Sequence, residues 1–338
     1  MLTVGFIGNG KSVNRYQLPY LLIRDNFRVK TIFTRNLSHQ RWQKVEDIYY
    51  TNNLYDLLND PEIQLVNVCT NVDSHYEYAK MVLEHGKHCL VEKPFMMSYQ
   101  QAKEVFELAK EKGLVVQCYQ NRRYDSDFLT VQKVIESGKL GNLLEVEMHN
   151  DFYRAHVPHK SEQYLVSESC LYNHASHRLD QVISYFGRPE KIHYDVRQLL
   201  RIEKMNDYFD LDLYYDRLKI SVKSSYFRVK ERPSFVVYGE KGCFIKDSKD
   251  KQEEHLKLFY LPGSPNFGVD CKEDYGTLCY YDENNHYHEE KIVSSVGDYG
   301  RVFDCLYDTI IEGKESPVHE EEILIQMAIL ETGGKMCK

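Results

Sequence analysis

The 338-residue sequence contains no run of 18 apolar residues, so no transmembrane helix is expected. Its first residues, MLTVGFIGNG, lack the charged, apolar and small-residue regions of a secretion signal. It also lacks an excess of basic residues, and the net charge of −8 argues against a nucleic-acid partner. With 42% hydrophobic and 28% charged residues, the composition is typical of a soluble protein, and we expect a cytoplasmic one.

No two cysteines stand at the CxxC spacing of a zinc ribbon or a redox motif. The nine cysteines are Cys69, Cys89, Cys118, Cys170, Cys243, Cys271, Cys279, Cys305 and Cys337. Because the number is odd and the positions are scattered, a disulfide framework is not expected either. Several cysteines lie in apolar runs, where a free thiol behaves as a small hydrophobe, which fits a reducing compartment.

The length exceeds what a single core normally supports, so two domains are expected. Over residues 1–120, short apolar runs alternate with helical patterns. The expected strands are Leu2–Ile7, Val29–Phe33, Leu65–Cys69, Cys89–Val91 and Leu114–Cys118. Wholly apolar strands separated by helices predict a doubly wound α/β domain of the Rossmann type, with a parallel sheet covered on both faces.

After about residue 143 the pattern changes to strands in which apolar and polar residues alternate, which is typical of an antiparallel sheet with one wet face. The expected strands are Leu143–His149, Ile192–Val196, Phe209–Tyr215, Leu218–Ser224, Phe235–Tyr238 and Leu278–Tyr281. Helices are expected near 168–186, 299–311 and 319–331, and the last two could pack back on the first domain. Residues 121–338 therefore form the predicted α+β domain, in which the polar stretch Lys246–His255 is expected to be a solvated loop or hairpin end.

The first expected strand runs directly into a glycine turn that precedes a helical segment. The residues of this turn are Gly8, Asn9, Gly10, Lys11 and Ser12. Gly8 allows the tight turn and Gly10 lets backbone amides approach a pyrophosphate at a helix N-terminus. Val13 stands where the third glycine of the dinucleotide fingerprint is usual, which weakens the motif but keeps the phosphate site.

The second strand ends without the carboxylate that normally binds the ribose 2′-hydroxyl of NAD(H). Thr34 and Arg35 stand there, and the next acid is Glu46. This favours NADP(H), whose 2′-phosphate an arginine can bind. Alternatively, Arg35 is a solvated loop residue, or it stacks on the adenine and accepts NAD(H) as well.

Several further segments resemble the glucose–fructose oxidoreductase/inositol dehydrogenase/MocA (Gfo/Idh/MocA) family of oxidoreductases. The segments are Val68–His75, Gly86-Lys87-His88, Val91-Glu92-Lys93-Pro94, Gln120-Asn121-Arg122, Ser137–Gly141 and Gly297–Arg301. The resemblance covers essentially the whole chain. It is closest to the uncharacterised bacterial branch of the family, whose first turn reads Gly-x-Gly-Lys-Ser.

The resemblance implies which residues of the first domain bind the cofactor and which one acts on the reacting oxygen. The implied cofactor contacts are Thr70, Asn71, His75, Glu92, Lys93, Pro94 and Asn121. Lys93 is implied to lie beside the reacting oxygen, where a lysine polarises the oxygen and passes a proton if its pKa is lowered. Alternatively, Lys93 is an ordinary surface charge, and His75 is a helix cap or a packed ring.

The family's His-x-x-Asp signature corresponds here to His177 and Asp180, which share one face of the expected helix. His177 is implied to be the general base, and Asp180 to bind substrate or orient Lys93. Asn173 and Ala175 replace the usual Asp and Gly before the histidine, and His174 is an addition. No metal is expected, because potential ligands on one helix seldom converge. A structural hydrogen-bonded pair of His177 and Asp180 is the alternative.

Substrate contacts are expected from two short segments and from the expected helix near 168–186. The candidates are Arg122, Tyr124, Tyr153, Arg154, His156 and His174. The 27 tyrosines agree with a polar aromatic pocket, although most of them will be ordinary sheet residues. The resemblance also implies a homo-oligomer, a dimer or tetramer, formed through the open face of the sheet.

Together these patterns predict an NADP(H)-preferring oxidoreductase, with NAD(H) possible, acting on a secondary alcohol or ketone of a sugar, inositol or related polyol. One alternative is a dinucleotide-binding sensor that has lost catalysis, which Asn173 and Ala175 leave open. Another keeps the cofactor but cleaves a glycoside or reduces a different carbonyl or imine.

Overall fold

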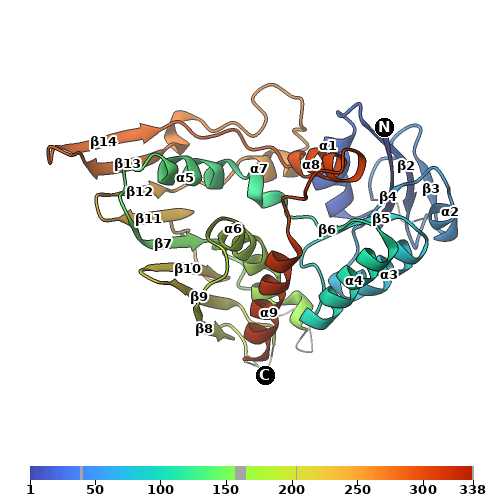
Figure 1. Ribbon diagram of the computed structural model, residues 1–338, viewed down its shortest axis with the longest axis horizontal. Coiled ribbons are helices and arrows are strands. Elements are labelled where there is room, and N and C mark those ends of the chain that lie inside the picture. The colour runs from blue at the N-terminus through green and yellow to red at the C-terminus, as the bar shows by residue number, and fades with distance from the viewer. Residues whose placement is uncertain (39–40, 157–164, 203, 337–338) are drawn as a thin grey trace. The chain divides into compact units, whose positions relative to one another are not determined.

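The computed structural model describes residues 1–38, 41–156, 165–202 and 204–336 (Figure 1). Cys337 lies outside this range. The chain divides into two compact units. The first contains Met1–Asn121, Glu253–Phe267 and Tyr299–Met327, and the second contains Arg122–Gln252, Gly268–Asp298 and the chain from Ala328 onward. Among the described helices, none has both the length and the apolar character that a membrane span requires.

The first unit is built on a six-stranded sheet in which all neighbouring strands are parallel. Its strands are β1 (Leu2–Ile7), β2 (Phe27–Phe33), β3 (Tyr49–Thr51), β4 (Leu65–Val68), β5 (His88–Val91) and β6 (Val116–Cys118). The spatial order β3-β2-β1-β4-β5-β6 is that of a doubly wound dinucleotide-binding fold and confirms the predicted fold class. The chain changes direction of winding between β1 and β4, and ligands of such sheets bind at the carboxyl ends of these strands.

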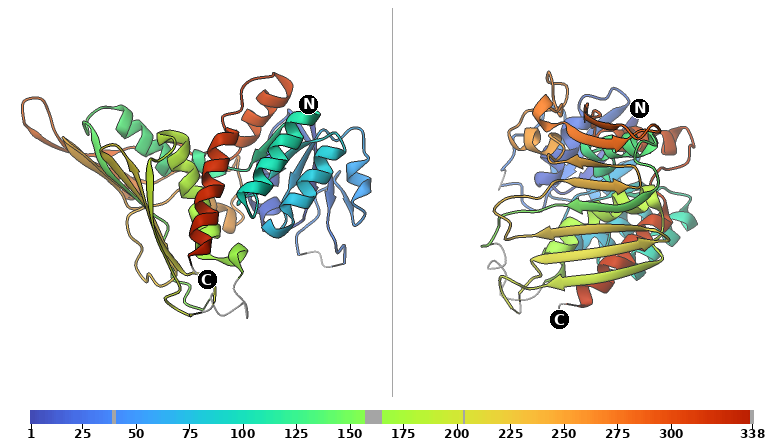
Figure 2. Two further views of the ribbon diagram at one scale, coloured as in Figure 1. Left: turned by 60° about the horizontal axis from the view of Figure 1, so that its bottom comes forward. Right: turned by 90° about the vertical axis from the view of Figure 1, so that its left-hand side faces the viewer.

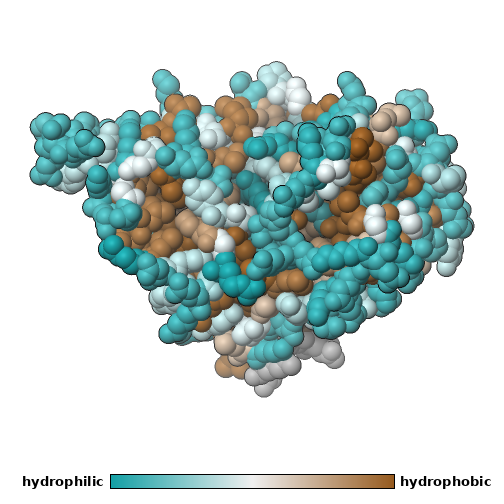
Figure 3. All heavy atoms as spheres, viewed as in Figure 1, coloured by the Kyte–Doolittle hydropathy of each residue, from teal (hydrophilic) through white to brown (hydrophobic). Residues whose placement is uncertain are grey.

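The helices of the first unit connect the parallel strands, except for the last one, which comes from the C-terminal part of the chain. They are η1 (a π-helix, Ser12–Gln17), α1 (Leu18–Leu21), α2 (Tyr55–Leu58), η2 (Val72–Ser74), α3 (His75–Glu84), α4 (Tyr99–Lys112) and α8 (Arg301–Ile311). In α4, Ala102, Val105, Phe106 and Ala109 are buried at helical spacing. The outer side of α3 and α4 is hydrophilic on the face seen in Figure 3.

Helix α4 begins directly after Ser98, which caps its first turn. The Ser98 hydroxyl accepts a hydrogen bond from the backbone N–H of Gln101, 3.2 Å away, so it satisfies one of the unpaired donors of the first turn. The Gln101 side chain accepts from the N–H of Met97 rather than from that of Ser98. The second hydrogen bond of a standard capping box, to the N–H of the capping residue, is here displaced by one residue to Met97.

The second unit is built on an eight-stranded sheet, in which only β7 and β10 pair in parallel. Its strands are β7 (Leu143–His149), β8 (Lys191–Arg197), β9 (Tyr208–Tyr215), β10 (Leu218–Ser225), β11 (Phe235–Gly239), β12 (Gly242–Lys246), β13 (Gly276–Tyr281) and β14 (Tyr287–Ile292). The spatial order is β14-β13-β12-β11-β7-β10-β9-β8. This confirms the predicted α+β domain and adds β12 and β14, which were not predicted.

One face of this sheet is covered by helices and the other is open, as the two views of Figure 2 show. The covering helices include α5 (Ser126–Glu136) and α6 (Ser176–Phe186), which contact β12 and β10 respectively. In β9, Phe209, Leu211 and Leu213 are buried and alternate with more exposed residues. The open face carries exposed tyrosines, among them Tyr214 and Tyr238, but the homo-oligomer stays a prediction.

The prediction of a solvated loop at Lys246–His255 is wrong. Lys246 ends β12 on the same inward side as Phe244, and its side chain is 0% exposed. Its ammonium donates to the carboxylate of Asp270 at 2.7 Å and to the carbonyl of Asp274 at 2.6 Å. Asp250 and Gln252 are buried as well, and Gln252 begins helix α7 (Gln252–Lys257). Polar residues of this stretch are buried here because they have ionic or hydrogen-bonding partners, which composition alone does not show.

Candidate functional site

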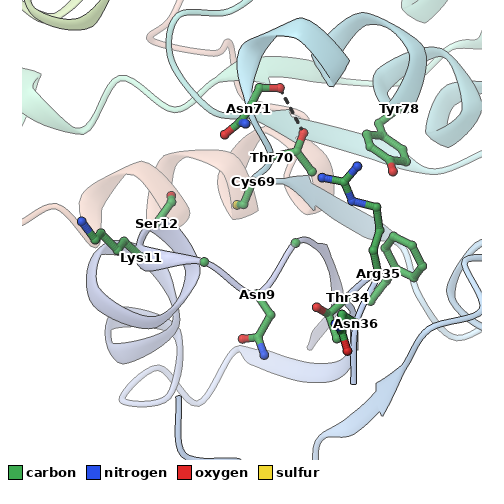
Figure 4. A pocket seen from close by; sticks show the side chains of 13 residues that line it. Asn9, Lys11, Ser12, Thr34, Arg35, Asn36, Cys69, Thr70, Asn71 and Tyr78 are labelled. Carbon is green, nitrogen blue, oxygen red and sulfur yellow. Dashed lines mark hydrogen bonds between the residues drawn. The ribbon is translucent and has the colours of Figure 1, made fainter. Parts of the chain in front are cut away.

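The first unit contains a cavity of about 540 Å³ at the carboxyl ends of β1, β2 and β4 (Figure 4). Its lining consists of Gly8, Asn9, Gly10, Lys11, Ser12, Phe33, Thr34, Arg35, Asn36, Cys69, Thr70, Asn71 and Tyr78. The cavity lies at the point where the winding of the sheet changes direction, which is where a dinucleotide binds in this fold. Nine of the predicted cofactor residues are thereby brought together.

The two glycines of the first turn have different surroundings. Gly8 has a φ of +115°, and a Cβ atom added to it would lie 2.5 Å from the carbonyl oxygen of Cys69. Its N–H donates to the carbonyl of Phe33 at 2.9 Å, so the turn is held tightly between β2 and β4. A Cβ atom at Gly10 would meet no protein atom within 4 Å. Gly8 therefore shapes the turn, whereas Gly10 leaves space above the backbone for a ligand.

The turn leads into η1 through contacts that involve Asn14, a residue that the sequence analysis did not single out. The side-chain amide of Asn14 donates to the Asn9 side chain at 2.8 Å and to the Gly10 carbonyl at 2.9 Å. Val13, at the place of the third fingerprint glycine, is fully buried. The departure from the fingerprint therefore faces the interior and leaves the cavity side of the turn unchanged.

The charge of the cavity lining is positive. Lys11 and Arg35 line it, and the described residues of the lining include no aspartate or glutamate. In Figure 4 the Arg35 side chain extends from the end of β2 toward Tyr78 of α3 and toward Thr70.

The cavity also contains four residues that sequence analysis did not assign to the cofactor site. These are Phe33, Asn36, Cys69 and Tyr78. Phe33, Asn36 and Cys69 stand next to predicted positions in the same strand ends, so adjacency was the available signal. Tyr78 lies within α3 and is indistinguishable in the sequence from an ordinary half-buried helix residue.

Glu92 follows β5 and is not part of the cavity lining. Its side chain is turned toward η1, where it accepts hydrogen bonds from the Ser12 hydroxyl and, at 2.8 Å, from the side-chain amide of Gln17. The backbone N–H of Lys93 donates to the other carboxylate oxygen at 3.1 Å. Glu92 thus ties the first helix to the end of β5, immediately before Lys93 and the cis peptide bond to Pro94.

His75 is also placed behind the cavity lining, with 1% of its surface exposed. Its Nδ1 atom lies 3.1 Å from the Pro94 carbonyl, and its Nε2 atom lies 3.1 Å from the Thr70 carbonyl. Burial is the main reason why the pKa of His75 is lowered. This geometry matches the alternative of a packed ring, which here joins the segments after β4 and β5.

In the second unit, His177 and Asp180 lie on α6, which follows the π-helix η6 (Leu171–Ala175). Both are buried. The carboxylate of Asp180 accepts two hydrogen bonds from the guanidinium of Arg123, at 2.8 and 2.7 Å. Arg123 belongs to η3 (Asn121–Tyr124), and sequence analysis did not select it. This two-pronged contact fixes α6 against the segment that follows β6.

Breaking the Arg123–Asp180 pair is expected to destabilise the protein strongly. Arg123→Met leaves the carboxylate of Asp180 buried without its cation, which costs about 3–5 kcal/mol. Urea unfolding followed by circular dichroism measures the loss. The control is Lys103→Met, which removes one partner of the exposed Lys103–Glu107 pair and should cost less than about 0.5 kcal/mol. Equal stabilities of the two variants would contradict a structural role of the buried pair.

The predicted substrate residues fall into two groups within the second unit. Arg122 forms an ion pair of 3.3 Å with Asp125, whose pKa burial raises well above its usual range. The neighbouring Tyr124 is buried. In the other group, the centre of the His174 ring lies 4.5 Å from the centre of the Phe152 ring, and Tyr153 is 64% exposed.

Asn121, the remaining predicted cofactor contact, is buried at the start of η3. Among the described residues, no cluster of histidine, cysteine or acidic side chains has the arrangement of a metal site.

Comparisons with known proteins agree with this geometry. Residues 2–120 match a family model described as an oxidoreductase family with an NAD-binding Rossmann fold, and residues 132–337 match the C-terminal alpha/beta domain of an oxidoreductase family. The uncharacterized oxidoreductase YhhX of Escherichia coli is 45% identical over 335 residues, which cover 98% of this chain and 96% of that protein.

Two further relatives also extend over nearly the whole chain. IolW of Bacillus subtilis, named as a scyllo-inositol 2-dehydrogenase (NADP(+)), is 29% identical, with 100% of this chain and 94% of IolW covered. The crystal structure of an oxidoreductase from Bacillus cereus superposes with a TM-score of 0.91 at 42% identity, covering 98% of this chain and 95% of that one.

Proposed function

Because the chain belongs to the Gfo/Idh/MocA family of oxidoreductases, we propose that it transfers hydride between NADP(H) and a secondary alcohol, or the corresponding ketone, of a sugar, inositol or related polyol. The observation that best supports this proposal is the cavity at the ends of β1, β2 and β4. Gly8 and Gly10 shape its first turn, and its charged lining residues are Lys11 and Arg35. The name of IolW supports both NADP(H) and a cyclic polyol.

In this proposal the cofactor is bound by the residues that line the cavity. The backbone of Gly8, Gly10 and the first turn of η1 would hold the pyrophosphate, because free N–H groups at a helix start favour phosphate oxygens. Thr34 and Arg35 would bind the 2′-phosphate. Thr70 and Asn71 would lie along the nicotinamide half, with Glu92, Pro94, His75 and Asn121 acting from behind as positioning residues. The bound nicotinamide supplies the hydride acceptor or donor.

The chain itself handles the proton. Lys93 would bind the reacting oxygen and polarise it, since an ammonium group stabilises the developing negative charge. His177 would take the hydroxyl proton during oxidation and return it during reduction. Asp180 would act as a positioning residue, because its carboxylate is occupied by Arg123. Asn173 donates its side-chain amide to the Ser169 carbonyl at 3.0 Å and supplies no carboxylate, so the proton chemistry rests on Lys93 and His177.

The cofactor proposal is tested by fluorescence titration with NADPH and with NADH. We expect NADPH to bind in the micromolar range and more tightly than NADH. Arg35→Asp should weaken NADPH about 100-fold and NADH only a few-fold, because the new carboxylate repels the 2′-phosphate.

Lys44→Asp is the control for this titration. It changes the charge by the same amount as Arg35→Asp, but at an exposed residue outside the cavity lining. Equal weakening of both dinucleotides by Arg35→Asp would remove the 2′-phosphate argument. If the unaltered protein bound neither dinucleotide, the oxidoreductase mechanism proposed for this cavity would fail.

A further inference from the structure

The second unit carries a group of cations at one edge of its sheet. Arg154 follows β7, Arg228 and Arg232 follow β10, and Lys249 follows β12. These three strands run in the same direction, because β7 and β10 are parallel and β11 is antiparallel to both β7 and β12. Their carboxyl ends therefore meet at the same edge. We call Phe152 and these four residues the Phe152 cluster.

Two of these cations lie against the same aromatic ring. The guanidinium carbon of Arg154 is 4.0 Å from the centre of the Phe152 ring, and the ammonium nitrogen of Lys249 is 4.8 Å from it. Cation–π contacts stabilise each charge separately. The two charges still repel each other, and the repulsion is larger where burial keeps water away. Burial is the main reason why the pKa of Lys249 is lowered, and the charges of Arg178 and Arg122 lower it further.

The acids near the cluster do not balance these charges. Asp151 is bound by Arg232 through hydrogen bonds of 2.7 and 2.9 Å, and Glu231 is bound by Lys249 at 2.6 Å. The carboxylate of Asp207 accepts hydrogen bonds from the backbone N–H groups of Leu199 and Leu200.

Within the described parts of the chain, neither Arg154 nor Arg228 forms an ion pair or a side-chain hydrogen bond. The buried Nε atom of Arg228 has no acceptor there. Of the four cations in the cluster, Arg232 and Lys249 are therefore paired with acids, whereas Arg154 and Arg228 form no ion pair with a described residue.

The Phe152 cluster contacts His174, which lies just before the helix that contains the proposed base, His177. The ring of His174 lies 4.5 Å from the Phe152 ring, and its Nε2 atom lies 3.0 Å from the Tyr226 hydroxyl. His174 precedes His177 by three residues, so the two stand about one helical turn apart. A molecule whose hydroxyl is handled by His177 could therefore extend to Arg154 with a short carbon chain or a sugar ring.

We propose that the substrate carries an anionic group, a carboxylate or a phosphate, and that Arg154, assisted by Arg228 and Lys249, binds it. This inference rests on the proposed function and narrows its substrate class from neutral polyols to acidic sugars or polyols. A guanidinium suits either anion, because its planar N–H groups can donate two parallel hydrogen bonds to two oxygens. An anion at this place would also offset the repulsion between the cations on Phe152.

The test uses the full chain saturated with NADP⁺ and compares matched probes by isothermal titration, with initial rates measured wherever turnover occurs. D-Gluconate is compared with D-glucitol, and D-glucose 6-phosphate with D-glucose. We expect at least one acidic probe to bind about tenfold or more tightly than its neutral partner, and the preferred pair shows whether the anion is a carboxylate or a phosphate.

Arg154→Met should remove most of this preference, and Arg154→Lys should restore part of it, since the charge returns without the planar fork. Arg217→Met is the control, because Arg217 is an exposed cation paired with Glu240 and lies outside the cluster. It should leave the preference unchanged.

Neutral probes that bind as tightly as acidic ones would overturn the inference, as would an undiminished preference in Arg154→Met or no binding of any acidic probe. NADPH titration of the same preparations separates this failure from that of the proposed function. Normal NADPH binding without an anion preference overturns only the substrate class, whereas loss of NADPH binding in the unaltered protein overturns the proposed function itself.

Discussion

Lys93→Ala is expected to lower turnover by about 10²–10⁴-fold while NADPH affinity changes by no more than about twofold. The factor is that of losing one positioned proton-transfer group. Lys93 stands at the end of β5, directly after Glu92, whose carboxylate is held by Ser12, by Gln17 and by the Lys93 backbone. The backbone at Lys93 is therefore fixed independently of its side chain, and the truncated variant should keep its fold.

Initial rates with a panel of neutral and acidic polyols, measured by NADPH absorbance, check this expectation. Lys103→Ala, at an exposed position on α4, is the control and should have the activity of the unaltered protein. Undiminished turnover in Lys93→Ala would contradict the catalytic role.

The same assays separate the remaining alternatives. NADPH binding without turnover on any substrate would indicate a sensor, and product formation without net NADPH consumption would indicate glycoside cleavage.

The parts of the fold that could be predicted are those whose evidence is local. Wholly apolar runs such as Leu2–Ile7 identify buried parallel strands because both of their faces are covered. Two of the missed strands, β3 and β14, lack this signal. β3 is only three residues long, and β14, with the sequence YHEEKI, is a largely exposed strand at the edge of its sheet. A strand of this kind has no apolar alternation, so only its pairing with β13 reveals it.

The candidate site shows the same division. The turn from Gly8 to Ser12 and the end of β2 could be assigned from the sequence, since contiguous residues line the cavity. The orientation of Glu92 could not, because its partner Gln17 is 75 residues away. The same is true of Asp180, which is paired with Arg123 across 57 residues. A motif predicts which residue types are present at a site, whereas long-range contacts decide which of them face the ligand.

Gly8→Ala and Gly10→Ala are expected to damage the protein in different ways, although the two residues are neighbours in one turn. At Gly8 the new Cβ would lie 2.5 Å from the Cys69 carbonyl oxygen, in a backbone conformation with φ +115°. Neither the strain nor the clash can be relieved without moving β4, so a loss of stability of about 2–4 kcal/mol is expected. At Gly10 the Cβ meets no protein atom within 4 Å, and stability should change by less than about 0.5 kcal/mol.

Cofactor affinity distinguishes the two variants further. In Gly10→Ala the methyl group occupies the space above the turn where a pyrophosphate would approach the backbone, so NADPH should bind about 10–100-fold more weakly although the fold is intact. Gly113→Ala is the control for Gly8, because Gly113 has a positive φ of 66° but no atom near its Cβ position. It should lose only about 1 kcal/mol and keep full affinity. Urea unfolding and NADPH titration of the three variants measure both quantities. If Gly10→Ala bound NADPH as tightly as the unaltered protein, the pyrophosphate could not lie over this turn.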